Sequence, residues 1–129
     1  MREAPGLLCD VIVVGPESLA AHGAEWLGIM RLWERVVHYI NDPATQDDAL
    51  RIMSARVGVD VATYRKLLDG TRLMTLADNR RSFVDSRNIM SLYESARLAD
   101  AFNVREGVYK TAQPVSKYLD SGFLSALKE

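Results

Sequence analysis

The stretch AEWLGIMRLWERVVHYIN, residues 24–41, decides the fold class. Its large apolar side chains recur at spacings of four, three, four and three residues: Trp26, Met30, Trp33, Val37 and Ile40. This periodicity predicts an amphipathic α-helix with one face turned toward a core. The dipeptide Asp42-Pro43 ends the helix, because the residue before a proline disfavours helical backbone.

Two further helices are predicted directly after this one. Thr45 and Asp48 have the spacing of a capping box, and Gly58 is a suitable residue to end the helix that they begin. Asp60 is expected to cap a shorter helix, which Gly70 closes. The side chains expected to face inward from the two helices are Ala49, Leu50, Ile52, Met53 and Val57, then Tyr64, Leu67 and Leu68.

The rest of the chain toward its C-terminus is predicted to be helical as well. Thr75 is a good N-cap for a helix that runs to about Phe83, and Ser91 begins another. This second helix is expected to turn Leu92, Ala96, Ala99 and Phe102 inward. Asp120 is expected to cap a last short helix, Ser121 to Leu127.

One segment has a different character. Residues Cys9 to Val14 are a short apolar, β-branched run that Gly15-Pro16 interrupts, which predicts a buried strand, and a short helix follows over residues 17–22. A lone strand has no partner for its edges. The sequence therefore predicts a mainly α fold, one N-terminal strand (9–14) followed by about six helices (16–128), in a single domain over residues 1–129.

Composition excludes several classes of protein. The 16 Lys and Arg residues nearly balance the 17 Asp and Glu residues, so a nucleic-acid binder that works through bulk positive charge is excluded and no nucleic-acid partner is expected. The single cysteine, Cys9, excludes an intrachain disulfide, and as part of a buried strand it is expected to behave as a small hydrophobe. No phosphate-binding glycine loop is visible, and no cofactor is expected.

Three groups of side chains are candidates for a functional site. His22 and His38 lie sixteen residues apart without metal-ligand spacing, so one is expected on the surface and the other on a helix flank. Arg80, Arg81 and Arg87 suit an anion, but Asp78, Asp85 and Glu94 lie among them, which favours a salt-bridged surface. Trp26 and Trp33 suit ligand stacking, but their common helix face favours a place in the core. No convergent acid, base or nucleophile set indicates an enzyme.

No secretory signal or membrane span is visible. The apolar stretch from residue 7 to residue 14 is interrupted by Asp10, and Leu7-Leu8-Cys9 lacks the preceding hydrophobic region of a lipoprotein signal. The sequence as it stands is expected to remain in the cytoplasm.

The order of the segments carries a resemblance. Residues Val11 to Leu19 read as a strand and a short helix, Trp26 to Ile40 as a long helix that ends at Asn41-Asp42-Pro43, and two helices follow at Ala49–Gly58 and Tyr64–Leu68. Four more segments come in order: residues 75–79 with Phe83, Ser91–Ala96, Phe102 with Gly107, and Tyr118–Leu124. This succession resembles the C-terminal part of solute-binding proteins of ABC importers, of the NMT1/THI5-like group that binds sulfonates, taurine, nitrate and thiamine precursors.

The resemblance implies a non-catalytic fragment of a two-lobed α/β periplasmic-binding fold. It covers about Cys9 to Lys128, places Val14, Gly15 and Pro16 near the hinge, and leaves the ligand-binding residues unassigned. The full-length parent would be periplasmic or exposed at the cell surface, bind a small organic solute and deliver it to an ABC permease. The thiamine-precursor synthase branch is disfavoured, because its cysteine-rich motif is absent.

Such a fragment is expected to dimerise through its strand or through exposed apolar surface. The alternative to the transport protein is a free-standing helical interaction or regulatory module whose partner covers the strand.

Overall fold

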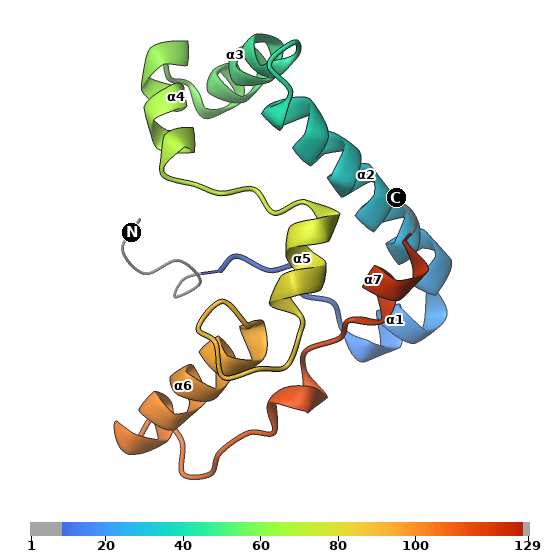
Figure 1. Cartoon of the computed structure of the whole chain (residues 1–129), viewed down its shortest axis with the longest axis vertical. Helices are drawn as coiled ribbons and strands as arrows, with labels where there is room; N and C mark the ends of the chain where they lie inside the picture. Colours follow the sequence, from blue (N-terminus) through green and yellow to red (C-terminus); the bar gives the residue numbers. More distant parts are fainter. Residues whose placement is uncertain (1–8, 128–129) are drawn as a thin grey trace. The chain divides into compact units, whose positions relative to one another are not determined.

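The computed structural model describes residues 9–127, and within them the fold is mainly α-helical (Figure 1). These residues form seven α-helices and one short 3₁₀ helix, and none of them is in a β-strand. The elements in chain order are α1 (Pro16–Ala21), α2 (Gly23–Asn41), α3 (Gln46–Val57), α4 (Val61–Asp69), α5 (Leu76–Ser82), α6 (Leu92–Arg105), η1 (Val115–Lys117) and α7 (Gly122–Ala126).

The predicted strand at residues 9–14 is wrong. The structure places none of residues 9–14 in a strand, and Cys9, Val11, Ile12 and Val13 are exposed rather than buried. A strand exists only where a neighbouring strand takes up its backbone hydrogen bonds, and none of residues 9–127 forms one. The β-branched composition is therefore not sufficient to form a sheet.

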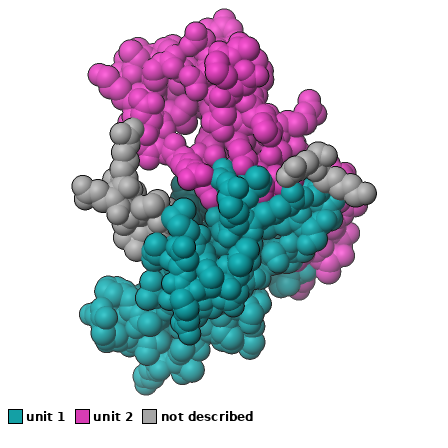
Figure 2. Space-filling model, viewed as in Figure 1, with its two compact units in different colours: residues 1–16, 77–129 teal, residues 17–76 magenta. Residues whose placement is uncertain are grey.

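The chain divides into two compact units (Figure 2). One unit consists of residues 17–76, and the other combines residues 77–127 with the described N-terminal residues 9–16. Each has its own small set of buried side chains, and each is described separately below.

In the unit of residues 17–76, α3 packs against the end of α2, and α4 packs against α3 (Figure 1). The buried apolar side chains of this unit are Val37 and Ile40 from α2, Ala49 and Leu50 from α3, and Leu76. Asp42 ends α2 in an extended conformation before Pro43, as the sequence predicts. Because α3 covers only the last turns of α2, the predicted inner face of α2 is fully buried only at its C-terminal end, at Val37 and Ile40.

Several side chains expected in the core are therefore exposed. Trp33 lies on the predicted inner face of α2 but beyond the reach of α3, and it is exposed. Ile52 is exposed because two helical positions separate it from Leu50 by about 200°, which turns it to the opposite face. Three others expected to face inward are also exposed: Val57, Leu67 and Phe102.

The helix ends follow local chemistry. Gly58 ends α3 with a φ of 79°, a left-handed conformation that favours glycine. Asp60 caps α4 by accepting a hydrogen bond from the Thr63 amide at 2.9 Å. The predicted capping box at Thr45 is wrong, because the Thr45 hydroxyl donates to the Tyr39 carbonyl instead and makes no cap to α3.

In the other unit, α6 packs against η1, and a buried carboxylate fixes the loop between them. Asp100 accepts hydrogen bonds from the Tyr109 hydroxyl at 2.7 Å and from the Gln113 amide at 2.9 Å. Ser91 begins α6 as predicted, although its hydroxyl donates to the Val84 carbonyl. Asp120 accepts from the Gly122 amide at 2.7 Å, but α7 begins one residue later than predicted, so Ser121 and not Asp120 is its N-cap residue.

Candidate functional site

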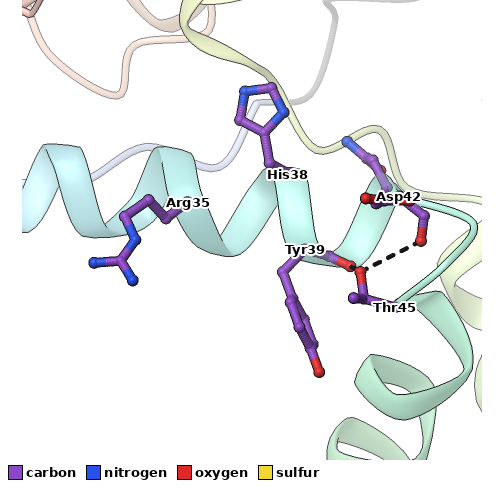
Figure 3. Close-up of a pocket in the computed structure, with 6 residues that line it drawn as sticks. Arg35, His38, Tyr39, Asp42 and Thr45 are labelled. Atoms are coloured by element: carbon purple, nitrogen blue, oxygen red, sulfur yellow. Dashed lines mark hydrogen bonds between the residues drawn. The ribbon is translucent and has the colours of Figure 1, made fainter.

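A polar depression lies at the C-terminal end of α2 (Figure 3). Its volume is about 540 Å³, and it belongs wholly to the unit of residues 17–76. The lining side chains come from the last turns of one helix and the turn after it: Arg35, His38, Tyr39, Asn41, Asp42 and Thr45. Because Asp42-Pro43 ends α2 here, the dipeptide determines where these lining side chains lie.

Hydrogen bonds within the turn fix its backbone. The Thr45 hydroxyl donates to the Tyr39 carbonyl at 2.6 Å and lies 3.4 Å from the Asp42 carbonyl oxygen (Figure 3). The Asp42 carboxylate accepts from the Ala44 amide at 2.9 Å. The bond from Thr45 satisfies the Tyr39 carbonyl, which the end of α2 would otherwise leave open.

Tyr39 links the depression to α3. Its hydroxyl donates to the Asp48 carboxylate at 2.6 Å, and Arg51 forms an ion pair with the same carboxylate. The hydrogen bond from Tyr39, followed by that from Arg51, lowers the pKa of Asp48, and the same bond to Asp48 raises the pKa of Tyr39. Tyr39 is therefore held as a neutral hydrogen-bond donor.

Glu34 connects α2 to the start of α5. Its carboxylate lies 3.0 Å from His38 Nε2 and accepts a hydrogen bond from the Leu76 amide at 2.7 Å. A carboxylate at a helix start satisfies an open N–H group and interacts favourably with the helix dipole. The sequence gives no local signal for this contact, because 42 residues separate Glu34 from Leu76.

The depression does not assemble a reaction centre from its lining residues. Arg35 and Tyr39 lie on one side of α2, while His38 points to the other side (Figure 3). His38 is bonded to Glu34, and Tyr39 is bonded to Asp48. The Arg35 guanidinium lines the same depression and offers donors to a polar group.

A second, apolar groove lies on α6 within the other unit. Its volume is about 320 Å³, and its lining residues are Ile89, Ser95, Leu98, Ala99, Phe102 and Asn103. The Arg105 guanidinium lies 5.1 Å from the centre of the Phe102 ring, a cation–π distance. The groove is an uncovered helix face.

The arginine cluster is a salt-bridged surface at Arg81 and Arg87, as the sequence analysis favours. Arg81 pairs with Asp78 at 2.6 Å, and Arg87 lies 3.4 Å from Glu94. The Arg80 guanidinium also donates to the carbonyls of Leu124 at 3.4 Å and Leu127 at 2.5 Å. It holds the last helix in place.

The other candidate side chains lie apart from one another. His22 lies 3.8 Å from Glu25 and is exposed, and His38 lies on an exposed flank of α2. Within residues 9–127, no three His, Cys, Asp or Glu side chains converge as a metal site would require. Trp26 is half-buried and donates to the Ser18 hydroxyl at 3.1 Å.

The residues assigned near a hinge lie at the start of α1. Val14 is half-buried, Gly15 is exposed, and Pro16 is the first residue of the helix, a position that suits its missing N–H group. A Cβ built on Gly15 would meet no atom within 4 Å, so packing does not require glycine there.

One feature that the sequence analysis missed is a second apolar stripe on α2. Ile29, Leu32, Val36 and Tyr39 are all exposed, and Leu32 retains 56% of its accessible surface. Their spacing of three, four and three residues was available in the sequence as a signal. We call these four residues the outer stripe of α2.

Among the described helices, none combines the length and the apolarity needed to cross a membrane. No protein-family model, curated protein or solved structure matches the chain.

Proposed function

We propose that this chain is the C-terminal part of a solute-binding protein of an ABC importer. In this role it contributes one wall of a cleft for a small organic solute and catalyses no reaction. The second lobe and the rest of the first come from other sequence, and the complete protein works in the periplasm or at the cell surface with an ABC permease. The resemblance to the NMT1/THI5-like group is the origin of this proposal.

The observation that carries the proposal is the succession of helices. α2 ends at Asn41 before Asp42-Pro43, α3 and α4 follow with glycines at their ends, and α6 begins after Ser91. These are the helical segments on which the resemblance rests, in the same order.

Uncovered apolar surface adds support. The outer stripe of α2 and the groove on α6 face solvent, and contiguous exposed apolar side chains mark surfaces that other polypeptide covers. A chain that supplies one part of a larger core leaves such faces open when it is considered alone.

The decisive experiment is the size of the native protein in its source cells. An antibody against residues 91–129 should detect a species at least twice the 14.4 kDa of this chain, and tryptic peptides from it should extend upstream of residue 1. Cells without the gene provide the control. A native species of 14.4 kDa with no upstream peptide contradicts the proposal.

The solute class can then be tested on the full-length form. Calorimetric titration with taurine, nitrate and an alkanesulfonate is expected to give saturable binding with one of these probes. The isolated chain is a poor subject for this test, because polar groups from both lobes fix the ligand in a two-lobed cleft.

A helical interaction module is the second candidate, and the outer stripe of α2 is the observation that favours it. Four apolar side chains at heptad-like spacing suit a partner helix or a second copy of the chain. A 14.4 kDa native species that co-purifies with one protein in a fixed ratio would favour this function over transport.

A further inference from the structure

A row of exposed side chains runs along α2. The outer stripe holds its four apolar side chains in water, and Leu32 alone retains 56% of its accessible surface. Glu25 continues the row by one turn toward the N-terminus, because it lies four residues before Ile29, and its side chain is 68% exposed. Positions that alternate four and three residues apart form the seam along which one helix packs against another. The outer stripe and Glu25 together have this geometry.

One edge of the row carries a glycine and an arginine. Gly28 and Arg35 are seven residues apart, so two helical turns place them at nearly the same angle beside the stripe. Both are exposed, and among residues 9–127 no hydrogen bond or ion pair engages the Arg35 guanidinium. A Cβ built on Gly28 would meet no atom within 4 Å, although glycine is unfavourable in the interior of a helix. Packing within the described residues therefore does not account for this glycine, whereas the close approach of another chain would.

A second copy of the chain matches this row when the two α2 helices run antiparallel. A two-fold axis midway between Ile29 and Leu32 places Ile29 of each copy against Leu32 of the other. Glu25 and Arg35 lie on opposite sides of that midpoint, at distances that differ by one residue, about 1.5 Å of helix rise. In this register each Glu25 carboxylate lies beside the Arg35 guanidinium of the second copy, and Gly28 leaves room for the arginine side chain.

Charge disfavours the other arrangements of two α2 helices. In a parallel pair, the Glu25 side chains of the two copies meet in the seam. An antiparallel register centred between Leu32 and Val36 brings the two Arg35 side chains together, because Arg35 lies one residue from that centre. Like charges opposite each other across an interface are unfavourable. The register centred between Ile29 and Leu32 brings unlike charges together instead.

We infer that α2 is a homodimerisation surface, on which two copies of the chain pair antiparallel through the outer stripe with a Glu25–Arg35 ion pair at each end of the seam. The inference goes beyond the proposed function and does not rest on it, because it concerns the 129-residue chain by itself. Each copy contributes one helix, and a contact of that size gives reversible association.

Charge reversal followed by mixing tests the pairing in the recombinant chain. Glu25→Arg brings two arginines together at each end of the seam, and Arg35→Glu brings two carboxylates together. Each variant alone should therefore dimerise about tenfold more weakly than the wild type. A heterodimer of the two variants has unlike charges at both ends, so a 1:1 mixture should recover the wild-type dissociation constant in sedimentation equilibrium.

Matched controls separate the pairing from a general effect of charge. Arg31→Glu makes the same change one turn before Arg35 and farther from the stripe, so it should have a smaller effect than Arg35→Glu. Gly28→Lys places a bulky cation where Arg35 of the second copy lies and should weaken dimerisation, whereas Ala24→Lys adds the same charge one turn earlier and farther from the seam. These positions are exposed, so the helical circular dichroism of each variant should be unchanged.

The remaining outcomes overturn the inference. Single reversals that weaken dimerisation without recovery in the mixture would locate the charge effect within one chain. Variants that dimerise like the wild type would exclude the Glu25–Arg35 pairs. A wild-type chain that stays monomeric would leave the outer stripe for other polypeptide to cover. The mass of the native species, which tests the transport function, is a separate measurement, so failure of one proposal is distinguishable from failure of the other.

Discussion

The hydrogen bond between Tyr39 and Asp48 cannot be predicted from a local sequence pattern, because the two residues are nine positions apart and lie on different helices. At the residue scale, a hydrogen bond can be predicted from the sequence when its partners are a few residues apart, as Asp60 and Thr63 are. It fails where the partner is chosen by tertiary structure, as with Glu34 and the Leu76 amide. Thr45 shows the intermediate case, because two local acceptors compete for one hydroxyl.

Removing the Tyr39 hydroxyl should raise the pKa of Asp48. The hydrogen bond from Tyr39 is the largest cause of its lowered pKa, so Tyr39→Phe should move the pKa of Asp48 toward the ordinary value of about 3.9. Because the pKa is lower in the folded state than in the unfolded state, the stabilisation is complete above the unfolded value and is lost as pH falls through the folded one. Carboxyl NMR titration measures this shift, Tyr64→Phe is the control, and an unchanged pKa of Asp48 in Tyr39→Phe would refute the contact.

Loss of the Asp60 cap should fray α4. Hydrogen bonds from the Thr63 side chain, then from its amide, lower the pKa of Asp60, so acid and the Asp60→Ala substitution should act alike. We expect the Thr63 amide to exchange roughly five-fold faster in Asp60→Ala, whereas Asp60→Asn should remain near the wild-type rate. Asp69→Ala, at the opposite end of α4, is the control and should not accelerate exchange.

At the scale of the element, α2 shows which part of a helix the sequence determines. Its existence and its end at Asn41 follow from periodicity and from Pro43. Which of its apolar side chains are buried depends on where α3 returns, so Val37 is buried while Trp33 is not. The same reasoning explains residues 9–14, whose β-branched composition favours a strand although no neighbouring strand lies among the described residues.

Leu50 and Ile52 in α3 provide the test of this distinction, because both were expected to face inward. Leu50 has no exposed surface, whereas Ile52 keeps 58% of its own. Leu50→Ala should lower the free energy of unfolding by about 2–5 kcal/mol, and Ile52→Ala should change it by less than about 0.5 kcal/mol. Urea unfolding of the recombinant chain measures both, and equal losses would show that Ile52 is also buried.

For the molecule as a whole, the mainly helical class could be predicted from the sequence, and the candidate depression could not. The depression depends on how the turn at Asp42 and Thr45 folds back on Tyr39, a detail of bonding geometry rather than of pattern. The role of Arg80 likewise depends on the packing of α7, 44 residues away. Burial within each unit is limited, and exposed apolar faces remain.

The recombinant chain should therefore associate reversibly through the outer stripe of α2. Leu32→Glu should weaken this association at least tenfold, because burial of a leucine side chain contributes about 1.5–3 kcal/mol and each 1.4 kcal/mol is a factor of ten. Arg31→Glu places the same side chain about 100° away around the helix and should have a smaller effect. Sedimentation or light scattering over a broad concentration range measures this, and a monomer throughout would contradict it.

The exposed run at residues 11–14 also bears on aggregation. Amyloid-forming segments need about six or seven consecutive residues of high β-propensity with little charge and no proline. Here Asp10 stands on one side and Gly15-Pro16 on the other, so the stretch is held to four residues. A charge and a proline beside an apolar strand are the gatekeepers that proteins commonly place there. Residues 11–14 thus have the composition of a buried strand, but the apolar run is too short to build a cross-β fibril.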